Sequence, residues 1–379
     1  MPIRACRVCG KELLEKPLLH YENMPSSAQN FPDAASLQGD AGAPLTVCQC
    51  SGCGLAQLSG APVPYYREVI RAAAVSSVLT GFKAGQFSAF IDKYSLRGKK
   101  VLEVGCGRGE FLSLLRKLDV DAYGLEYSAP AVDQCVKSGL KVSRGYPDGE
   151  AGRFPGGPFD AFLLLMFLEH MPDPNSALRA IRENLAEGAV GIVEVPNFDM
   201  MLRNKLFSEF ISDHLLYFTS ETLRTALSLN GFDVLECAEL RDSYVLSAVV
   251  KKRGRLDVSA FSGHQALVTG GLKDYLARFE EKKVAVWGAG HQALALIAMA
   301  GIGDRIRYVV DSAPFKQGKY TPATHIPILA PEALRADPVE SVIVIAGSYS
   351  DEVAGILRRD FPGGLKIAIL RESGLEAAG

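Results

Sequence analysis

Four cysteines near the amino terminus are spaced like the ligands of a metal ion. Cys6 and Cys9 form one Cys-x-x-Cys pair, and Cys50 and Cys53 form a second. Each pair places two sulfur atoms at one ion, and two pairs complete the tetrahedral thiolate set that structural zinc prefers. We therefore expect structural zinc to stabilise a segment too short for its own core. Residues 45–50 alternate like a strand, so we expect the side chain of Cys48 to point away from the metal.

A second group of residues is suited to hold a ligand that carries a ribose. Residues 101–104 form an apolar run, residues 105–109 read Gly-Cys-Gly-Arg-Gly, and residues 110–118 are patterned as a helix. Glycines in such a turn let a ligand approach the backbone closely. The next apolar run ends at Glu126, whose carboxylate can accept hydrogen bonds from ribose hydroxyls. The acid Glu103 precedes the turn, which differs from the Gly-x-Gly-x-x-Gly of dinucleotide enzymes.

Alternating strands and helices must position these groups. The pattern predicts a helix from Ala72 to Tyr94, a strand over residues 159–165, a helix over 175–185 and a strand over 188–197. This alternation is typical of an α/β fold with a parallel sheet. Loop residues 166–174, which include Phe167, then follow a strand end.

A similar pattern recurs after the charged junction at residues 251–255. Residues 283–287 predict a strand, Gly288 and Gly290 a tight turn, and residues 306–310 a second strand that ends at Asp311. Taken alone, this block predicts a dinucleotide-binding unit, so a nicotinamide site has to be considered. We expect three domains, covering residues 1–64, 65–252 and 253–379.

Composition narrows the class of protein. The chain has 379 residues, of which 48% are hydrophobic, enough for two or three domains to bury their own cores. Lysine and arginine total 41 against 43 acids, a net charge of −2, and no lysine or arginine lies between Lys16 and Arg67. A nucleic-acid-binding module built on the cysteine segment is therefore disfavoured. Without a long apolar run, we expect a cytoplasmic enzyme with no membrane and no protein partner.

The central block resembles class I S-adenosylmethionine-dependent methyltransferases. The resemblance rests on the glycine turn, on Glu126, on residues 159–174 and on the strand at 188–197. It implies a Rossmann-like core with S-adenosylmethionine as the cofactor. The residues expected to contact this cofactor are Glu103, Gly105, Cys106, Gly107, Glu126, Tyr127 and Phe167.

The order of the three blocks resembles the sugar C-methyltransferases that act on nucleotide-linked keto-deoxysugars. Residues 308–328 are close to a signature of that family's last domain, and residues 50–58 look like its zinc segment. The resemblance implies a class I methyltransferase core between a small zinc-binding segment and a second Rossmann-like α/β domain. It also implies that the last domain helps to hold substrate and does not use nicotinamide.

The same resemblance implies the catalytic residues. The family carries a Glu-His pair with aromatic residues just downstream, and residues 210–218 match this pattern with His214 and with Asp213 in place of the glutamate. We expect His214 to remove a proton beside a carbonyl, with Asp213 orienting it. His170 would bind substrate or stabilise the enolate oxygen, and Tyr217 would donate to that oxygen.

The chain departs from the family's pattern before the catalytic pair, and two other functions stay open. Ile211 and Ser212 stand where the family usually has a tyrosine before the pair, which indicates a differently lined pocket. An O- or N-methyltransferase would keep the glycine turn and Glu126 while using His214 on a hydroxyl or an amine. A bifunctional enzyme would also bind NAD at the turn of Gly288.

Overall fold

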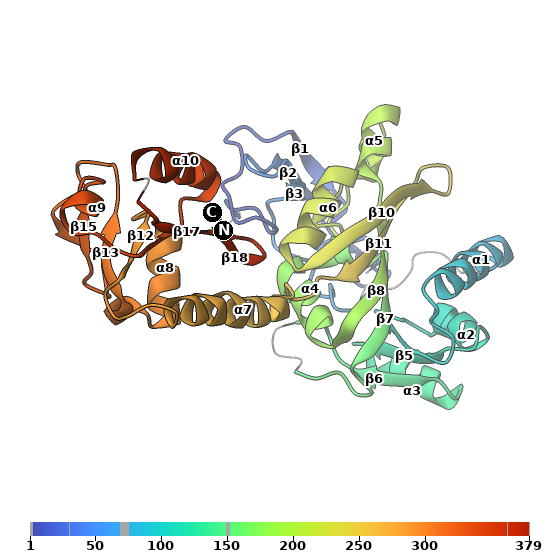
Figure 1. The fold of residues 1–379 in the computed structure, drawn as a ribbon. Coiled ribbons are helices and arrows are strands. Elements are labelled where there is room, and N and C mark those ends of the chain that lie inside the picture. Colours follow the sequence, from blue (N-terminus) through green and yellow to red (C-terminus); the bar gives the residue numbers. More distant parts are fainter. Residues whose placement is uncertain (1–2, 30, 69–75, 149–151, 362, 379) are drawn as a thin grey trace. The chain divides into compact units, whose positions relative to one another are not determined.

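A computed structural model describes residues 3–29, 31–68, 76–148, 152–361 and 363–378 (Figure 1). The chain divides into two compact units, Met1–Arg255 and Leu256–Gly379. Both are α/β, as predicted. The residues before Pro64 belong to the first unit, and their standing as a separate domain stays a prediction. The helix expected from Ala72 is α1, Ser77–Lys93; residues 72–75 lie outside the described residues.

A seven-stranded sheet forms the centre of the first unit. Its strand order is β10-β11-β8-β7-β4-β5-β6, with β4 to β8 parallel and β10 and β11 antiparallel. The chain leaves β4 toward β5 on one side and later returns to β7 on the other, and ligands bind at such a switch point. The strands are β4 Lys100–Val104, β5 Asp121–Glu126, β6 Lys141–Arg144, β7 Phe159–Leu165, β8 Leu185–Pro196, β10 Phe232–Leu240 and β11 Val245–Lys252.

Helices cover this sheet because each buries one apolar face. In α2, Phe111, Leu112 and Leu115 are buried and Glu110 and Arg116 stand at the two ends, where their charges suit the helix dipole. In α4, Asp173 caps the first turn by accepting from the Ser176 amide. The helices of this unit after α1 are α2 Glu110–Arg116, α3 Ala129–Lys137, α4 Pro174–Glu183, α5 Phe198–Asn204 and α6 Ser220–Leu229.

A second, four-stranded sheet joins the amino-terminal segment to the core. Its order is β1-β2-β3-β9, with β1 Leu19–Met24, β2 Ala43–Gln49 and β3 Ala56–Leu58 drawn in blue in Figure 1. The fourth strand, β9 Leu216–Tyr217, comes from the loop between α5 and α6. The segment therefore shares backbone hydrogen bonds with the loop that carries His214.

The second unit has its own seven-stranded sheet, in the order β14-β15-β13-β12-β16-β17-β18. Strands β12, β13, β15, β16 and β17 are parallel. Its strands are β12 Val284–Trp287, β13 Ile306–Val310, β14 Lys319–Tyr320, β15 Pro327–Leu329, β16 Ser341–Val344, β17 Lys366–Arg371 and β18 Gly374–Ala377, and its helices are α7 Ser259–Leu276, α8 His291–Ala300, α9 Ala333–Ala336 and α10 Ser350–Asp360. In the described part of the chain, every helix is too short or too polar to cross a membrane.

Candidate active site and metal centre

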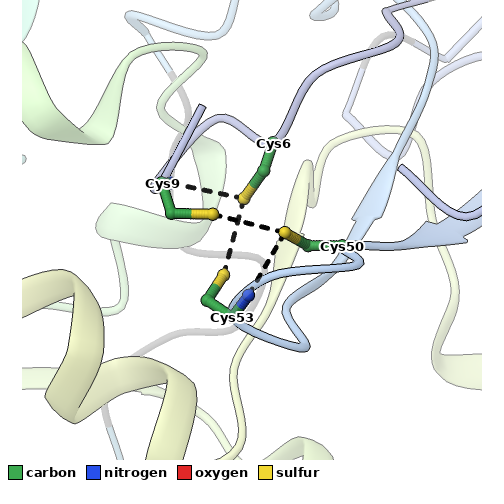
Figure 2. A group of neighbouring side chains, drawn as sticks. All are labelled: Cys6, Cys9, Cys50 and Cys53. Carbon is green, nitrogen blue, oxygen red and sulfur yellow. Dashed lines mark hydrogen bonds between the residues drawn. The ribbon is translucent and has the colours of Figure 1, made fainter. Parts of the chain in front are cut away.

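The four predicted cysteines meet at one point. The sulfur atoms of Cys6 and Cys53 lie 3.6 Å apart and those of Cys9 and Cys50 lie 3.3 Å apart. Figure 2 shows all four side chains converging. A tetrahedral zinc ion with bonds of about 2.3 Å would hold its sulfur atoms roughly 3.8 Å apart. The donor set and its spacing therefore fit zinc.

Backbone amides complete the cysteine cluster. Amide nitrogen atoms lie 3.3 to 3.5 Å from the sulfur atoms of Cys6 and Cys50. Donation from these amides favours the charged thiolate form. Although burial opposes the change, these amides and the neighbouring cysteines lower the pKa of Cys50 to about 7. Cys48 lies on β2 and is not among the clustered sulfur atoms.

The glycine turn and Glu126 also come together. Gly105 and Gly107 have φ of +71° and +54°, which is the left-handed region that favours glycine. The carboxylate of Glu126 accepts from the Gly107 amide at 2.8 Å and from the Ser128 amide at 2.9 Å. The acid is thus held against the turn at the carboxyl end of β5, where a ribose would meet both. Glu103 is buried on β4, and buried Cys106 follows Gly105.

Aromatic rings form a wall beside this turn. A β-carbon on Gly105 would lie 2.6 Å from the ring of Phe167, so the glycine is required for that ring to pack there. Tyr146 makes edge contacts with Phe167 and with Tyr127, at 5.9 and 6.2 Å between ring centres. Sequence reasoning missed Tyr146, although its place two residues after β6 was a usable signal. The rings stand next to a cavity of ≈ 250 Å³ lined by Arg67, Leu125, Tyr127, Arg144, Gly145, Tyr146, Asp148, Arg153, Phe154 and Pro155.

Two loops bring His170 and His214 into contact. His170 ends the short 3-10 helix η2, Leu168–His170, which follows β7, and its Nδ1–H donates to the carbonyl of Asp213 at 2.8 Å. The Leu215 amide donates to the carbonyl of Glu169 at 2.9 Å. The two imidazole rings meet edge to face, 4.7 Å between centres. The structure therefore places the two predicted histidines side by side.

The two histidines differ in exposure. His170 is buried, at 5% exposed, whereas His214 keeps part of its surface open and can reach a substrate. Burial lowers the pKa of His170. Burial and the charge of His170 together lower the pKa of His214 to about 3. Both imidazoles are therefore neutral near pH 7, the form that accepts a proton.

Asp213 is buried and holds its loop to the amino-terminal segment. Its carboxylate accepts from the Ala28 amide at 2.9 Å and from the hydroxyl of Tyr65 at 3.0 Å. Burial and the Asp213 charge raise the pKa of Tyr65. Tyr65 was missed, because a partner 148 positions away in the chain leaves no mark in local sequence.

The hydroxyl of Tyr217 is occupied by backbone groups. It accepts from the Ile211 amide at 3.0 Å and donates to the Ile211 carbonyl at 3.3 Å, and the ring is buried. In this arrangement Tyr217 shapes the loop that carries His214. Donation to a substrate oxygen, the role predicted for it, would require the hydroxyl to leave Ile211.

Two protein-family models match parts of this chain. Residues 82–237 match the model of a methyltransferase domain, and residues 262–367 match the model of a C-methyltransferase C-terminal domain. The second match covers most of the unit that contains Gly288 and Asp311.

Individual relatives cover different parts of the chain. The C-methyltransferase NovU of Streptomyces niveus is 23% identical over 93% of this chain and 91% of its own length. A ubiquinone biosynthesis O-methyltransferase of Methylococcus capsulatus is 37% identical over 91 residues, 23% of this chain and 38% of that relative. A solved S-adenosylmethionine-dependent methyltransferase of Clostridium acetobutylicum is 14% identical and covers 50% of this chain and 96% of its own, with a TM-score of 0.40.

The first domain match begins within α1 and ends within β10, so it includes the glycine turn, Glu126 and Phe167. Because both matched models describe methyltransferase domains, the chain is a methyltransferase.

Proposed function

We propose that the chain methylates a carbon beside the carbonyl group of a nucleotide-linked keto-deoxysugar. The observation that carries this proposal is the alignment with C-methyltransferase NovU, which spans the cysteine segment, the core and the last unit. The match to a C-methyltransferase C-terminal domain supports transfer to carbon. The second unit would help to hold the substrate, since the core carries the cofactor turn.

His214 is the base in this proposal. Bound S-adenosylmethionine supplies an electrophilic methyl group, which the residues at the glycine turn, Glu126, Tyr127 and Phe167 would hold. His214 removes the proton beside the carbonyl, and the carbon left with the electron pair attacks the methyl group. His170 donates its only proton to Asp213, so its Nε2 can only accept. It therefore cannot donate to the enolate oxygen.

We also propose that Cys6, Cys9, Cys50 and Cys53 hold structural zinc. Free thiols suit the reducing cytoplasm, which we propose as the location of the enzyme. Zinc would supply no chemistry at carbon. Its contribution is to hold the segment whose strand β3 pairs with β9, two residues after His214.

A second candidate is transfer to oxygen. A ubiquinone biosynthesis O-methyltransferase matches this chain at 37% identity, though over only 91 residues. This similarity covers 23% of the chain, against the 93% covered by C-methyltransferase NovU. The two functions differ in the product, and NMR of the product distinguishes a methyl group on carbon from one on oxygen.

Calorimetry tests the proposal in two steps. S-adenosylhomocysteine should bind the purified protein, and one nucleoside diphosphate of a panel should bind to the resulting complex. The keto-deoxysugar linked to that nucleotide should then receive a methyl group on carbon, which NMR of the product identifies. His214→Gln should slow the transfer by about 10²–10⁴-fold while leaving the affinity for S-adenosylhomocysteine unchanged. A methyl group on oxygen would overturn carbon methylation, and full activity in His214→Gln would rule out His214 as the base.

A further inference from the structure

We propose that Glu169 is the counter-ion that allows His214 to keep the proton it takes from the substrate. This inference rests on the proposed function, since it assigns the partner of the base in that reaction. Glu169 was not among the residues expected from the sequence, although it stands next to His170. It touches no reacting atom and is a positioning residue.

The burial of Glu169 calls for an explanation. Its side chain is 1% exposed, and neither carboxylate oxygen accepts a hydrogen bond from a neighbouring group. A buried acid without such partners is costly and is rare in folded proteins. The buried Glu126 of the same unit has two amide donors instead. Glu169 therefore does not serve the fold in the way that Glu126 does.

The two histidines are the groups that Glu169 can reach. Its Oε1 lies 3.9 Å from Nε2 of His170. One oxygen of Glu169 and one ring nitrogen each of His170 and His214 lie within 4.8 Å of one another. Because Nδ1 of His170 donates to the Asp213 carbonyl, the neutral ring turns a proton-free Nε2 toward Glu169.

The surroundings of the cluster hold little other charge. The charge of Glu169 contributes to the raised pKa of Tyr244, after burial and Glu209. Asp213 is committed to Ala28 and Tyr65. The titratable groups that face Glu169 and His214 are His170 of η2, Asp213 and Tyr217 of the loop and of β9, and Tyr244 with its partner Glu209.

The charge of the cluster decides whether His214 can act. When His214 takes the proton, the C–H bond breaks, an N–H bond forms and the electron pair stays on the substrate carbon. With Glu169 as carboxylate, the cluster goes from one negative charge to none. With Glu169 protonated, it goes from neutral to a buried positive charge that no other member of the cluster balances. Opposite charge at this distance favours the imidazolium strongly in a buried setting.

The fraction of Glu169 that is ionised then determines how much of the enzyme is in its active form. Burial raises the pKa of Glu169 to about 8, with its own backbone amide opposing. The carboxylate form is depleted below this pH and grows above it. His214 is already neutral throughout that range, because its pKa is lowered to about 3.

Carbon-13 NMR of the full-length protein bound to S-adenosylhomocysteine tests the coupling. The chain has six histidines, and His170→Gln and His214→Gln assign the two rings. Both rings should show a step near pH 8 in the wild type and none in Glu169→Gln. Glu169→Asp should keep the step. Glu209→Gln removes a different carboxylate, one that contacts Tyr244, and should also leave the step in place.

Each outcome decides the proposal. A step that persists in Glu169→Gln, or no step in the wild type, overturns it. Loss of a second bound metal ion in Glu169→Gln would assign the cluster to a metal instead. These readouts need no methyl acceptor, so they stand apart from a failure of the proposed reaction.

Discussion

The Leu58 amide donates to the carbonyl of Leu215 at 2.9 Å, which ties the cysteine segment to the loop next to His214. The same segment holds the other histidine loop. The guanidinium of Arg7 donates to the Pro172 carbonyl at 2.9 Å, and the side-chain amide of Asn175 donates to the carbonyl of Val8 at 2.7 Å. The cysteine knuckle therefore contacts both loops of the candidate active site.

Removing one cysteine of the cluster should disturb catalysis at a distance. We expect Cys50→Ser to lose bound zinc and to lower methyl transfer more than tenfold, because β3 would no longer fix β9. Elemental analysis should find about one zinc per chain in the wild type. Cys237→Ser, on β10 and outside the cluster, is the matched control and should keep both metal and activity. Full zinc occupancy in Cys50→Ser would contradict the assignment.

Local sequence patterns were sufficient to predict much of the fold. The run at 101–104, the turn after it and the acid at 126 predicted β4, the glycine cradle and the end of β5, because each depends on residues close in the chain. The strand predicted at 159–165 is β7, residue for residue. The cysteine pairs were equally readable, since their spacing is itself the geometric requirement.

Long-range pairing could not be predicted in this way. The pairing of β3 with β9 joins Ala56 to Tyr217, and neither short strand has a periodic pattern that marks it. Asp213 was expected to orient His214, yet its carboxylate contacts Tyr65 and Ala28, groups far away in sequence. Glu169 was overlooked because a buried acid is recognised by missing partners, which only coordinates reveal.

Gly105→Ala should weaken cofactor binding more than its backbone strain alone would. Gly105 and Gly98 share φ near +70°, so alanine at either position costs about 1–2 kcal/mol. Only at Gly105 would the new β-carbon meet a ring, that of Phe167 at 2.6 Å; at Gly98 it meets nothing within 4 Å. Calorimetry should therefore show weaker S-adenosylhomocysteine binding, by more than about tenfold, in Gly105→Ala alone. Equal affinities in the two variants would refute this role for Gly105.

Two lysines of α1 should differ sharply in their effect on stability. Lys83 forms a buried ion pair with Glu194 of β8, whereas Lys93 pairs with Glu236 at the surface. Lys83→Met should lower the free energy of unfolding by about 3–5 kcal/mol, because Glu194 would stay buried without its partner. Lys93→Met should cost less than about 1 kcal/mol. Urea denaturation followed by circular dichroism measures both, and similar losses would be inconsistent with burial as the cause.

Asp311 should make the second unit sensitive to acid. Burial opposes ionisation of its carboxyl group, but Lys316 and the amides of Ala313 and Ala289 outweigh it and lower the pKa. A folded pKa below the unfolded value means that this stabilisation is complete above about pH 4 and is lost as the pH falls through the folded value. Asp311→Asn should therefore lower the free energy of unfolding by about 1.5–3 kcal/mol at pH 7, with a smaller deficit at pH 3.

The chain's one tryptophan makes the stability of the second unit measurable. Trp287 is buried on β12, next to the turn that Asp311 holds, so its fluorescence reports the unfolding of the second unit. Asp304→Asn, an exposed acid of the same unit, is the control and should change stability by less than about 0.5 kcal/mol at either pH. If the deficit of Asp311→Asn were the same at pH 3 as at pH 7, the carboxylate would not be its source, because at the lower pH the wild-type group is losing its charge as well.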